Sequence, residues 1–206
     1  MPATSRATSR VLILPGWQNS GPAHWQSRWE ALHGFERVQQ ADWDWPRRGD
    51  WMAQLDAAVL ADPRPTALVA HSLGCQLVAA WAAHTPHAAH ITGALLVAPP
   101  DTSRDDMPPQ LSTWRAIVRR KLPFPALVVY SSNDPYCAAL RAQSMAADWG
   151  ADAQSLGDKG HINGESGLGD WPEGLRWLQR LMKAETAEAV EEVEAVEAVE
   201  AVGAKP

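Results

Sequence analysis

The segment from Thr66 to Cys75 constrains the fold of this chain more than any other stretch. Residues 66–70 form an apolar, partly β-branched run that is long enough for one buried strand. Residues 75–83 are apolar and rich in alanine, which favours a helix. Only His-Ser-Leu-Gly lies between them, so the chain has to turn sharply with Ser72 at the apex. A serine between a strand and a helix is typical of a nucleophile elbow, which exposes the hydroxyl above the sheet edge.

Small residues flank Ser72, as such a turn requires. Ala70 stands two positions before the serine and Gly74 two positions after it. The first position departs from the general G-x-S-x-G pattern, but a methyl group is tolerated there. A serine in front of a helix is also a common N-cap, because its hydroxyl accepts a hydrogen bond from a free N–H group. The local pattern leaves both interpretations open, and the rest of the chain has to decide between them.

Six apolar segments alternate with helical patterns along the chain. This alternation predicts an α/β fold, with a mostly parallel sheet of about six strands and helices on both faces. No inserted segment is long enough for a separate lid domain, and we expect one domain over residues 10–183. The expected strands are 10–15, 38–43, 66–70, 91–98, 125–131 and 151–156, and the expected helices are 23–32, 50–61, 75–83, a short 114–121, 136–149 and a last one beginning at 171–172.

The charge of the chain is concentrated at its end. Residues 184–206 contain seven of the 24 acidic residues and one of the 18 basic ones, so they account for the formal net charge of −6. The remainder is neutral, which argues against a nucleic-acid-binding face. Valines recur every third residue in 184–206 and give no steady helical stripe. We expect a disordered acidic tail there, with a partner-binding helix as the alternative, and a disordered N-terminus over residues 1–9.

Several cellular contexts are disfavoured by composition. Cys75 and Cys137 form no disulfide framework, which indicates a reducing compartment. No apolar run approaches the roughly 18 residues of a membrane span, and no apolar signal-peptide region follows residues 1–10. A cytoplasmic protein without membrane or nucleic-acid partners is therefore expected.

Acyl transfer by a serine needs a base and an acid that holds that base. In α/β-hydrolases these residues follow the serine in the order acid, then histidine. His161 lies in a glycine-flanked loop before the last helix, and Asp134 directly follows the fifth expected strand. Asp before Pro is also a common turn residue, and Asp101 and Asp158 are rival acids.

The remaining site predictions concern binding rather than proton transfer. The oxyanion hole is expected to use the backbone N–H groups of Leu73 and Trp17. The side chains expected to bind substrate follow expected strands at the carboxyl-end face and are Trp17, Trp43, Trp45 and His71. His84, His87 and His90 recur every three residues, but Pro86 interrupts the helix that would align them. We therefore expect no metal site.

Four motifs in order carry a family resemblance, namely Pro-Gly-Trp-Gln-Asn-Ser-Gly-Pro-Ala-His-Trp-Gln at 15–26, Ala-His-Ser-Leu-Gly-Cys at 70–75, Ser-Ser-Asn-Asp-Pro at 131–135 and Gly-His-Ile-Asn at 160–163. Over residues 10–183 the chain resembles the small serine hydrolases related to retinoblastoma-binding protein 9 and bacterial YdeN. The resemblance implies a compact α/β-hydrolase fold without a large lid, and a triad of Ser72, Asp134 and His161. The Leu-x-Cys-x-Glu pattern that would bind retinoblastoma-type pockets is absent, because Leu77 follows Cys75 at the glutamate position.

The sequence thus predicts a serine hydrolase that needs no cofactor and cleaves small esters or amides through an acyl-enzyme. One alternative is a hydrolase fold that serves as a protein-binding module with weak or no catalysis. Another is a peptidase or acyltransferase with the same triad, since fold and triad do not fix the substrate.

Overall fold

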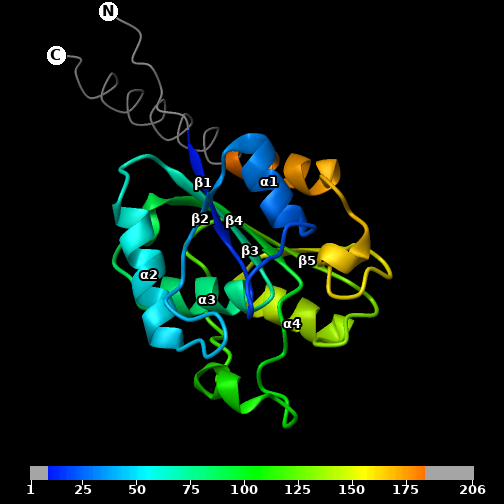
Figure 1. Cartoon of the computed structure of the whole chain (residues 1–206). Helices are drawn as coiled ribbons and strands as arrows, with labels where there is room; N and C mark the ends of the chain where they lie inside the picture. The colour runs from blue at the N-terminus through cyan, green and yellow to red at the C-terminus, as the bar shows by residue number, and fades with distance from the viewer. Residues whose placement is uncertain (1–8, 184–206) are drawn as a thin grey trace, which may run out of the picture.

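The computed structural model describes residues 9–183 and contains one six-stranded sheet (Figure 1). The strand order is β2-β1-β3-β4-β5-β6, and every neighbouring pair is parallel. This confirms the predicted fold class. The strands are β1 (Arg10–Leu14), β2 (Glu36–Arg37), β3 (Thr66–His71), β4 (Ile91–Val97), β5 (Ala126–Tyr130) and β6 (Asp152–Ser155).

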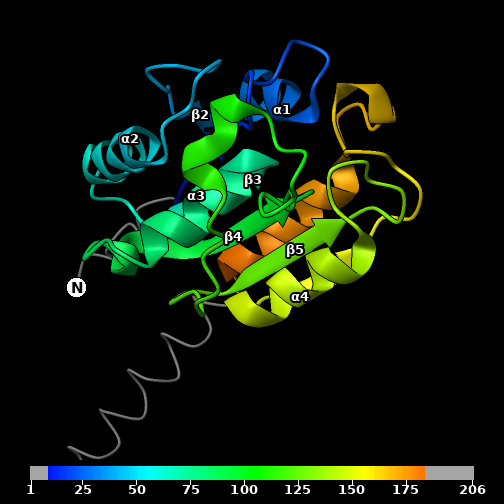
Figure 2. The same cartoon turned by 90° about the horizontal axis from the view of Figure 1, so that it is seen from below.

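Helices connect the parallel strands and cover both faces of the sheet. One face carries α2, α3 and α4, whereas α1 and the helix over residues 172–183 cover the other. Figure 2 shows this last helix in orange, on the far side of the sheet from α4. The helices are α1 (Trp25–His33), α2 (Arg48–Leu60), α3 (Leu73–Ala82) and α4 (Ala139–Trp149), and the short 3₁₀ turns are η1 (Ala88–His90), η2 (Pro109–Trp114) and η3 (Gly164–Ser166).

The central strand β3 shows why residues 67–70 are all apolar. Leu68 and Ala70 pack in the cluster with α2, α3 and α4, while Ala67 and Val69 pack in the cluster with α1 and the last helix. Successive side chains of a strand point to opposite faces, and here both faces are covered. All four residues are fully buried.

The predicted second strand over residues 38–43 is wrong. In this part of the chain only the two residues of β2 pair with β1. The N–H of Val38, just after β2, donates a further hydrogen bond to the carbonyl of Ile13 in β1 at 2.9 Å. Asp42 then accepts hydrogen bonds from the N–H groups of Asp44 and Trp45, at 2.9 and 2.8 Å. A side chain that bonds to the following backbone favours a turn over continued strand pairing.

The predicted helix over residues 114–121 is also wrong, because η2 ends at Trp114 and 115–121 are irregular. The carbonyl of Ala116 accepts from Arg48, and that of Val118 accepts from the indole of Trp149. The carbonyl of Ala116 would pair with the N–H of residue 120 in a helix over 114–121, and that of Val118 would lie in its last turn without a partner. The structure instead uses both carbonyl groups for tertiary hydrogen bonds in an irregular segment.

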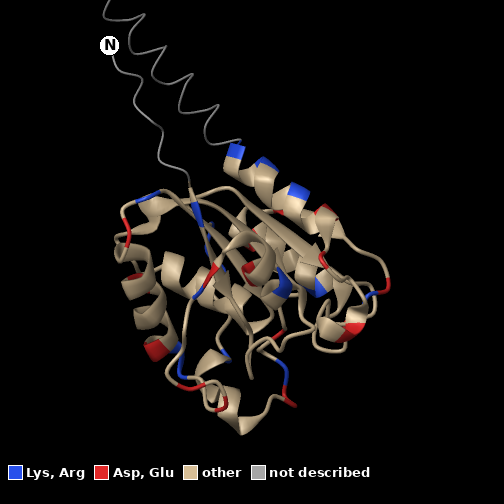
Figure 3. Cartoon of the chain, turned by 45° about the horizontal axis from the view of Figure 1, so that its top comes forward, with Lys and Arg blue, Asp and Glu red and all other residues tan. Residues whose placement is uncertain are grey.

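The carboxyl ends of the strands meet at one edge of the sheet, where ligands bind in open α/β folds. The segments that begin with Pro15, Ser72, Ser131 and residue 156 leave the sheet at this edge, and the third of them contains Asp134. Figure 3 shows basic and acidic residues interspersed over the elements rather than gathered on one of them. Within residues 9–183 no helix is long and apolar enough to cross a membrane. The expectations for 1–8 and 184–206 lie outside the described residues.

Candidate active site

Ser72 occupies a strained turn between β3 and α3. Its backbone has φ 53° and ψ −123°, a conformation that residues with a side chain rarely adopt. The N–H of Ser72 donates to Val97 of the neighbouring strand at 2.9 Å, and its carbonyl accepts from Cys75 at 2.9 Å. These bonds hold the turn in the sharp form that a nucleophile elbow needs. The N-cap alternative is not realised, since the Ser72 side chain makes no capping hydrogen bond.

Two glycines allow the backbone to close around Ser72. A Cβ atom at Gly74 would lie 2.3 Å from the carbonyl oxygen of Leu14, the last residue of β1. A Cβ atom at Gly16 would lie 2.6 Å from the Cβ of Ser72. Both distances are too short for any other residue. The loop after β1 is therefore packed directly against the serine.

Ser72, His161 and Asp134 form one chain of hydrogen bonds. His161 Nε2 lies 2.8 Å from Ser72 Oγ, and Nδ1 lies 2.9 Å from Asp134 Oδ2 and 3.0 Å from Oδ1. The Asp134 side chain is only 3% exposed. Its Oδ1 also accepts from the N–H of Tyr136 at 2.9 Å, so the carboxylate shapes its own turn while it contacts the histidine.

This arrangement favours one tautomer of His161. A carboxylate accepts only, so Nδ1 carries the proton and donates it to Asp134. Nε2 is then free to accept the hydroxyl proton of Ser72, the geometry required of a general base. The rival acids lie elsewhere, because Asp101 is paired with Arg141 at 3.3 Å and Asp158 accepts from Ser132 at 2.5 Å.

His71 links the nucleophile turn to the loop of His161. Its Nε2–H donates to the carbonyl oxygen of His161 at 2.9 Å, and the two rings lie 4.9 Å apart. Burial, reinforced by the nearby rings of His161 and His24, holds the pKa of His71 well below its ordinary value. A neutral His71 therefore fixes the main chain of His161. His71 lines the cavity, as predicted for a binding residue, but its Nε2–H is already engaged.

The two groups expected in the oxyanion hole lie on either side of the serine. Leu73 is the first residue of α3, so its N–H has no acceptor within the helix. The Trp17 loop is anchored by its indole, which donates to Asp44 at 3.0 Å, and by Gln18, whose N–H donates to Trp43 at 3.1 Å. The oxyanion role of both N–H groups stays a prediction.

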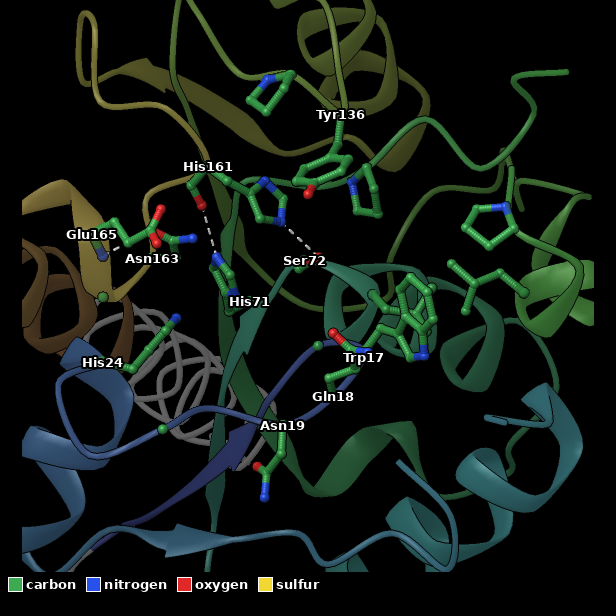
Figure 4. A pocket seen from close by; sticks show the side chains of 18 of the residues that line it. Trp17, Gln18, Asn19, His24, His71, Ser72, Tyr136, His161, Asn163 and Glu165 are labelled. Atoms are coloured by element: carbon green, nitrogen blue, oxygen red, sulfur yellow. Dashed lines mark hydrogen bonds between the residues drawn. The ribbon is translucent and has the colours of Figure 1, made fainter. Parts of the chain in front are cut away.

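A cavity of about 690 Å³ opens beside Ser72 (Figure 4). One part of its lining is apolar and comes from the β1 loop, the start of α3 and the segment before and within η2. Another part is polar and comes from the start of α1 and the loop after His161, with further polar residues in the β1 loop and in the segment before η2. The apolar members are Trp17, Leu73, Pro100, Met107, Pro108 and Leu111, and the polar or charged ones are Gln18, Asn19, His24, Arg104, Asp106, Asn163 and Glu165.

The predicted substrate-binding role of Trp43 and Trp45 needs correction, since neither residue lines this cavity. Trp43 packs edge-on against Trp51 at 5.3 Å, at the margin of the core. Trp45 is 58% exposed in the turn that Asp42 holds. Both residues lie in the loop that replaces the expected second strand, which contacts the Trp17 loop through the carbonyl groups of Trp43 and Asp44.

Sequence reasoning left several cavity residues without a role, among them His24, Tyr136, Asn163 and Glu165. The sequence could have indicated three of them as site residues. His24 lies in the first family motif, and Asn163 and Tyr136 each stand two positions after a residue of the proposed triad. The ring of Tyr136 packs edge-on against His161 at 4.6 Å. Glu165 gave no signal, since a glutamate after a glycine in a polar loop is ordinary.

His84, His87 and His90 do not converge on one point. His84 is hydrogen-bonded to the carbonyl of Ala80 at 2.8 Å, and the rings of His87 and His90 lie 6.3 Å apart. Among residues 9–183 there is no group of three or more His, Cys, Asp or Glu side chains placed to hold a metal ion.

Comparison with known proteins agrees with this geometry. A serine hydrolase family model matches residues 11–180. The chain belongs to the serine hydrolase family. A search of curated proteins finds no match.

Solved structures place this serine hydrolase beside the YdeN group, which confirms the predicted resemblance. A YdeN-like hydrolase from Pectobacterium atrosepticum is 28% identical, with a TM-score of 0.76 over 86% of this chain and 92% of that one. The ydeN gene product of Bacillus subtilis is 20% identical, with a TM-score of 0.67 over 85% and 100%. A Bacillus cereus carboxylesterase, 14% identical with a TM-score of 0.56 over 85% and 90%, shares the fold.

Proposed function

We propose that this serine hydrolase cleaves small esters through an acyl-enzyme, with Ser72 as nucleophile, His161 as base and Asp134 as the acid that orients it. The observation that carries the proposal is the continuous hydrogen-bonded chain from Ser72 Oγ to Asp134, with links of 2.8 and 2.9 Å. It lies at the strand ends and opens into the cavity.

The proposed reaction has two halves. Ser72 Oγ attacks the ester carbonyl while His161 Nε2 takes its proton, and the N–H groups of Leu73 and Trp17 stabilise the oxyanion. His161 then gives this proton to the departing alcohol, leaving the acyl group on Ser72. Water, deprotonated by the same His161, hydrolyses the acyl-enzyme. Asp134 stabilises the imidazolium in both halves.

The shape of the site favours short acyl groups. Within residues 9–183 no separate lid domain covers the cavity, and its apolar lining comes largely from loops. We expect acetate and butyrate esters to be cleaved faster than long-chain ones. Equal or better turnover of a C16 ester would contradict this expectation and point to a lipid-binding groove along residues 99–113.

Fluorophosphonate labelling tests the proposed function directly. The probe reacts with a serine that has both an activating base and an oxyanion hole. Wild-type protein should be labelled at Ser72, and Ser72→Ala should not be labelled. An unlabelled wild type, or a labelled Ser72→Ala, would overturn the enzyme assignment and favour the binding-module alternative. Comparing matched butyrate esters, amides and acyl acceptors would then separate an esterase from a peptidase or acyltransferase.

A further inference from the structure

One buried polar atom in the cavity lining lacks a partner. His24 is 6% exposed, and its Nε2 makes no hydrogen bond with any residue in 9–183. A buried unsatisfied donor is rare and costs roughly 1–3 kcal/mol, so it calls for an explanation. The first family motif contains this residue, and the catalytic proposal gives it no role.

The hydrogen bonds of His24 define what this atom can bind. The N–H of Gln26 donates to His24 Nδ1 at 3.1 Å, which caps the start of α1. Nδ1 is therefore the unprotonated nitrogen, and the proton of the neutral ring is on Nε2. Burial, together with the nearby Arg37 and His161, lowers the pKa of His24 to about 4, so the ring stays neutral near pH 7. Its Nε2–H is a donor that needs an acceptor.

The position of His24 identifies the part of a substrate that lies near it. His161 Nε2 delivers the proton to the leaving group, so the alcohol has to depart on the His161 side of Ser72. The ring of His24 packs edge-on against His71 at 4.6 Å, and His71 packs against His161. Figure 4 shows His24, with Asn163 and Glu165, on the opposite side of Ser72 from Trp17. The alcohol thus faces the side of His24, Asn163 and Glu165, and the acyl group faces the side of Trp17.

The loop after His161 is held against His24. The indole of Trp25 donates to the carbonyl of Ile162 at 2.8 Å. A Cβ atom at Gly164 would lie 3.4 Å from the backbone nitrogen of His24. These contacts fix Glu165, an exposed acceptor at the rim, beside a buried donor. Hydroxyl groups both donate and accept, so they can pair with the His24 donor and with the Glu165 acceptor. An ammonium group only donates, so it cannot accept the hydrogen bond from His24.

From this we infer that the His24 side of the cavity is a leaving-group subsite for polyhydroxylated alcohols, so that the substrates are esters of short apolar acids with glycerol-like or sugar-like alcohols. His24 Nε2–H donates to an oxygen of the alcohol, and Glu165 accepts from a hydroxyl. This inference rests on the proposed hydrolase function and specifies its substrate class.

The test uses two esters with the same acyl group and the same number of alcohol carbons, 1-glyceryl butyrate and propyl butyrate. Wild-type protein should show a kcat/KM at least about tenfold higher for the glyceryl ester, corresponding to two hydrogen bonds of ordinary strength. His24→Asn and His24→Ser both keep a capping oxygen for α1. Either variant should lower the glyceryl-to-propyl ratio about fivefold.

His33→Asn, on the same helix but exposed, is the matched control and should keep the wild-type ratio. A wild-type ratio near one overturns the subsite, and so does an unchanged ratio in folded His24→Asn, which would leave His24 only a capping role or a bound water. Both results keep the hydrolase assignment if propyl butyrate is cleaved and fluorophosphonate labels Ser72. Loss of labelling in wild-type protein would instead refute the proposed function itself.

Discussion

Replacing Asp134 with Asn tests the acid of the proposed triad with little disturbance of shape. The carboxylate contacts both His161 Nδ1 and the N–H of Tyr136. The amide of Asn can keep its oxygen on Tyr136, but then its NH₂ group faces Nδ1. Nδ1 then accepts a hydrogen bond from this NH₂ group, which favours the tautomer of His161 with its proton on Nε2. In that tautomer Nε2 can no longer accept the proton of Ser72.

The expected loss is large for catalysis and small for stability. A wrong tautomer lowers kcat by a factor on the order of 10⁴, equivalent to about 5.4 kcal/mol in the activation free energy. The melting temperature should fall by only about 2–4 °C, because the turn is retained and roughly 1 kcal/mol of hydrogen bonding is lost. KM should change far less than kcat.

Turnover of a butyrate ester and thermal unfolding of the same preparations measure the two effects. Asp101→Asn and Asp158→Asn are matched controls, since both carboxylates lie away from His161, and each should keep kcat within about threefold. Turnover of Asp134→Asn above about a tenth of the wild-type value would reject the assignment. A larger loss of turnover in Asp101→Asn than in Asp134→Asn would assign the role of the triad acid to Asp101.

Three further predictions follow from the packing around Ser72. Because the pKa of His24 falls from 6.5 to about 4 on folding, the unfolded chain binds the extra proton, and stability should fall as pH drops from 6.5 towards 4. Urea unfolding at pH 7 and pH 4.5 measures how much unfolding free energy each protein loses on acidification. This loss should be about 2–3 kcal/mol smaller in His24→Asn than in wild type, and equal losses in the two proteins would refute the argument. Gly74→Ala, which drives a methyl group into the carbonyl of Leu14, should lower the melting temperature by about 4–8 °C. Gly49→Ala, with open space at its Cβ, should not destabilise, and equal effects of the two would contradict the steric argument. His71→Leu should lower kcat about 10- to 100-fold with little change in KM, and His71→Gln, which retains a donor, should recover most of it. Equal losses in both variants would exclude the hydrogen bond as the cause.

Local sequence determined the parts of the site that depend on local sterics. Thr66 to Cys75 predicted the strand, the turn and the helix, because an apolar run, a serine apex and a following glycine permit little else. The order of Ser72, Asp134 and His161 along the chain placed all three at the carboxyl ends of parallel strands. The closeness of these residues then follows from topology, which the alternation of strands and helices had already indicated.

Tertiary structure decided what depends on contacts between distant residues. The hydrogen bond from His71 to the carbonyl of His161 joins residues 90 positions apart, and the local sequence around either residue does not predict it. Residues 114–121 were predicted as a helix, yet they form an irregular segment whose carbonyl groups at Ala116 and Val118 accept hydrogen bonds from Arg48 and Trp149. Trp43 and Trp45 were placed at the site by an expected strand that does not form. Periodicity records which face of an element is buried, but not which distant partner takes its hydrogen bonds. The elbow was therefore readable from the sequence, whereas most of the cavity lining beyond Trp17, His71 and the elbow itself was not.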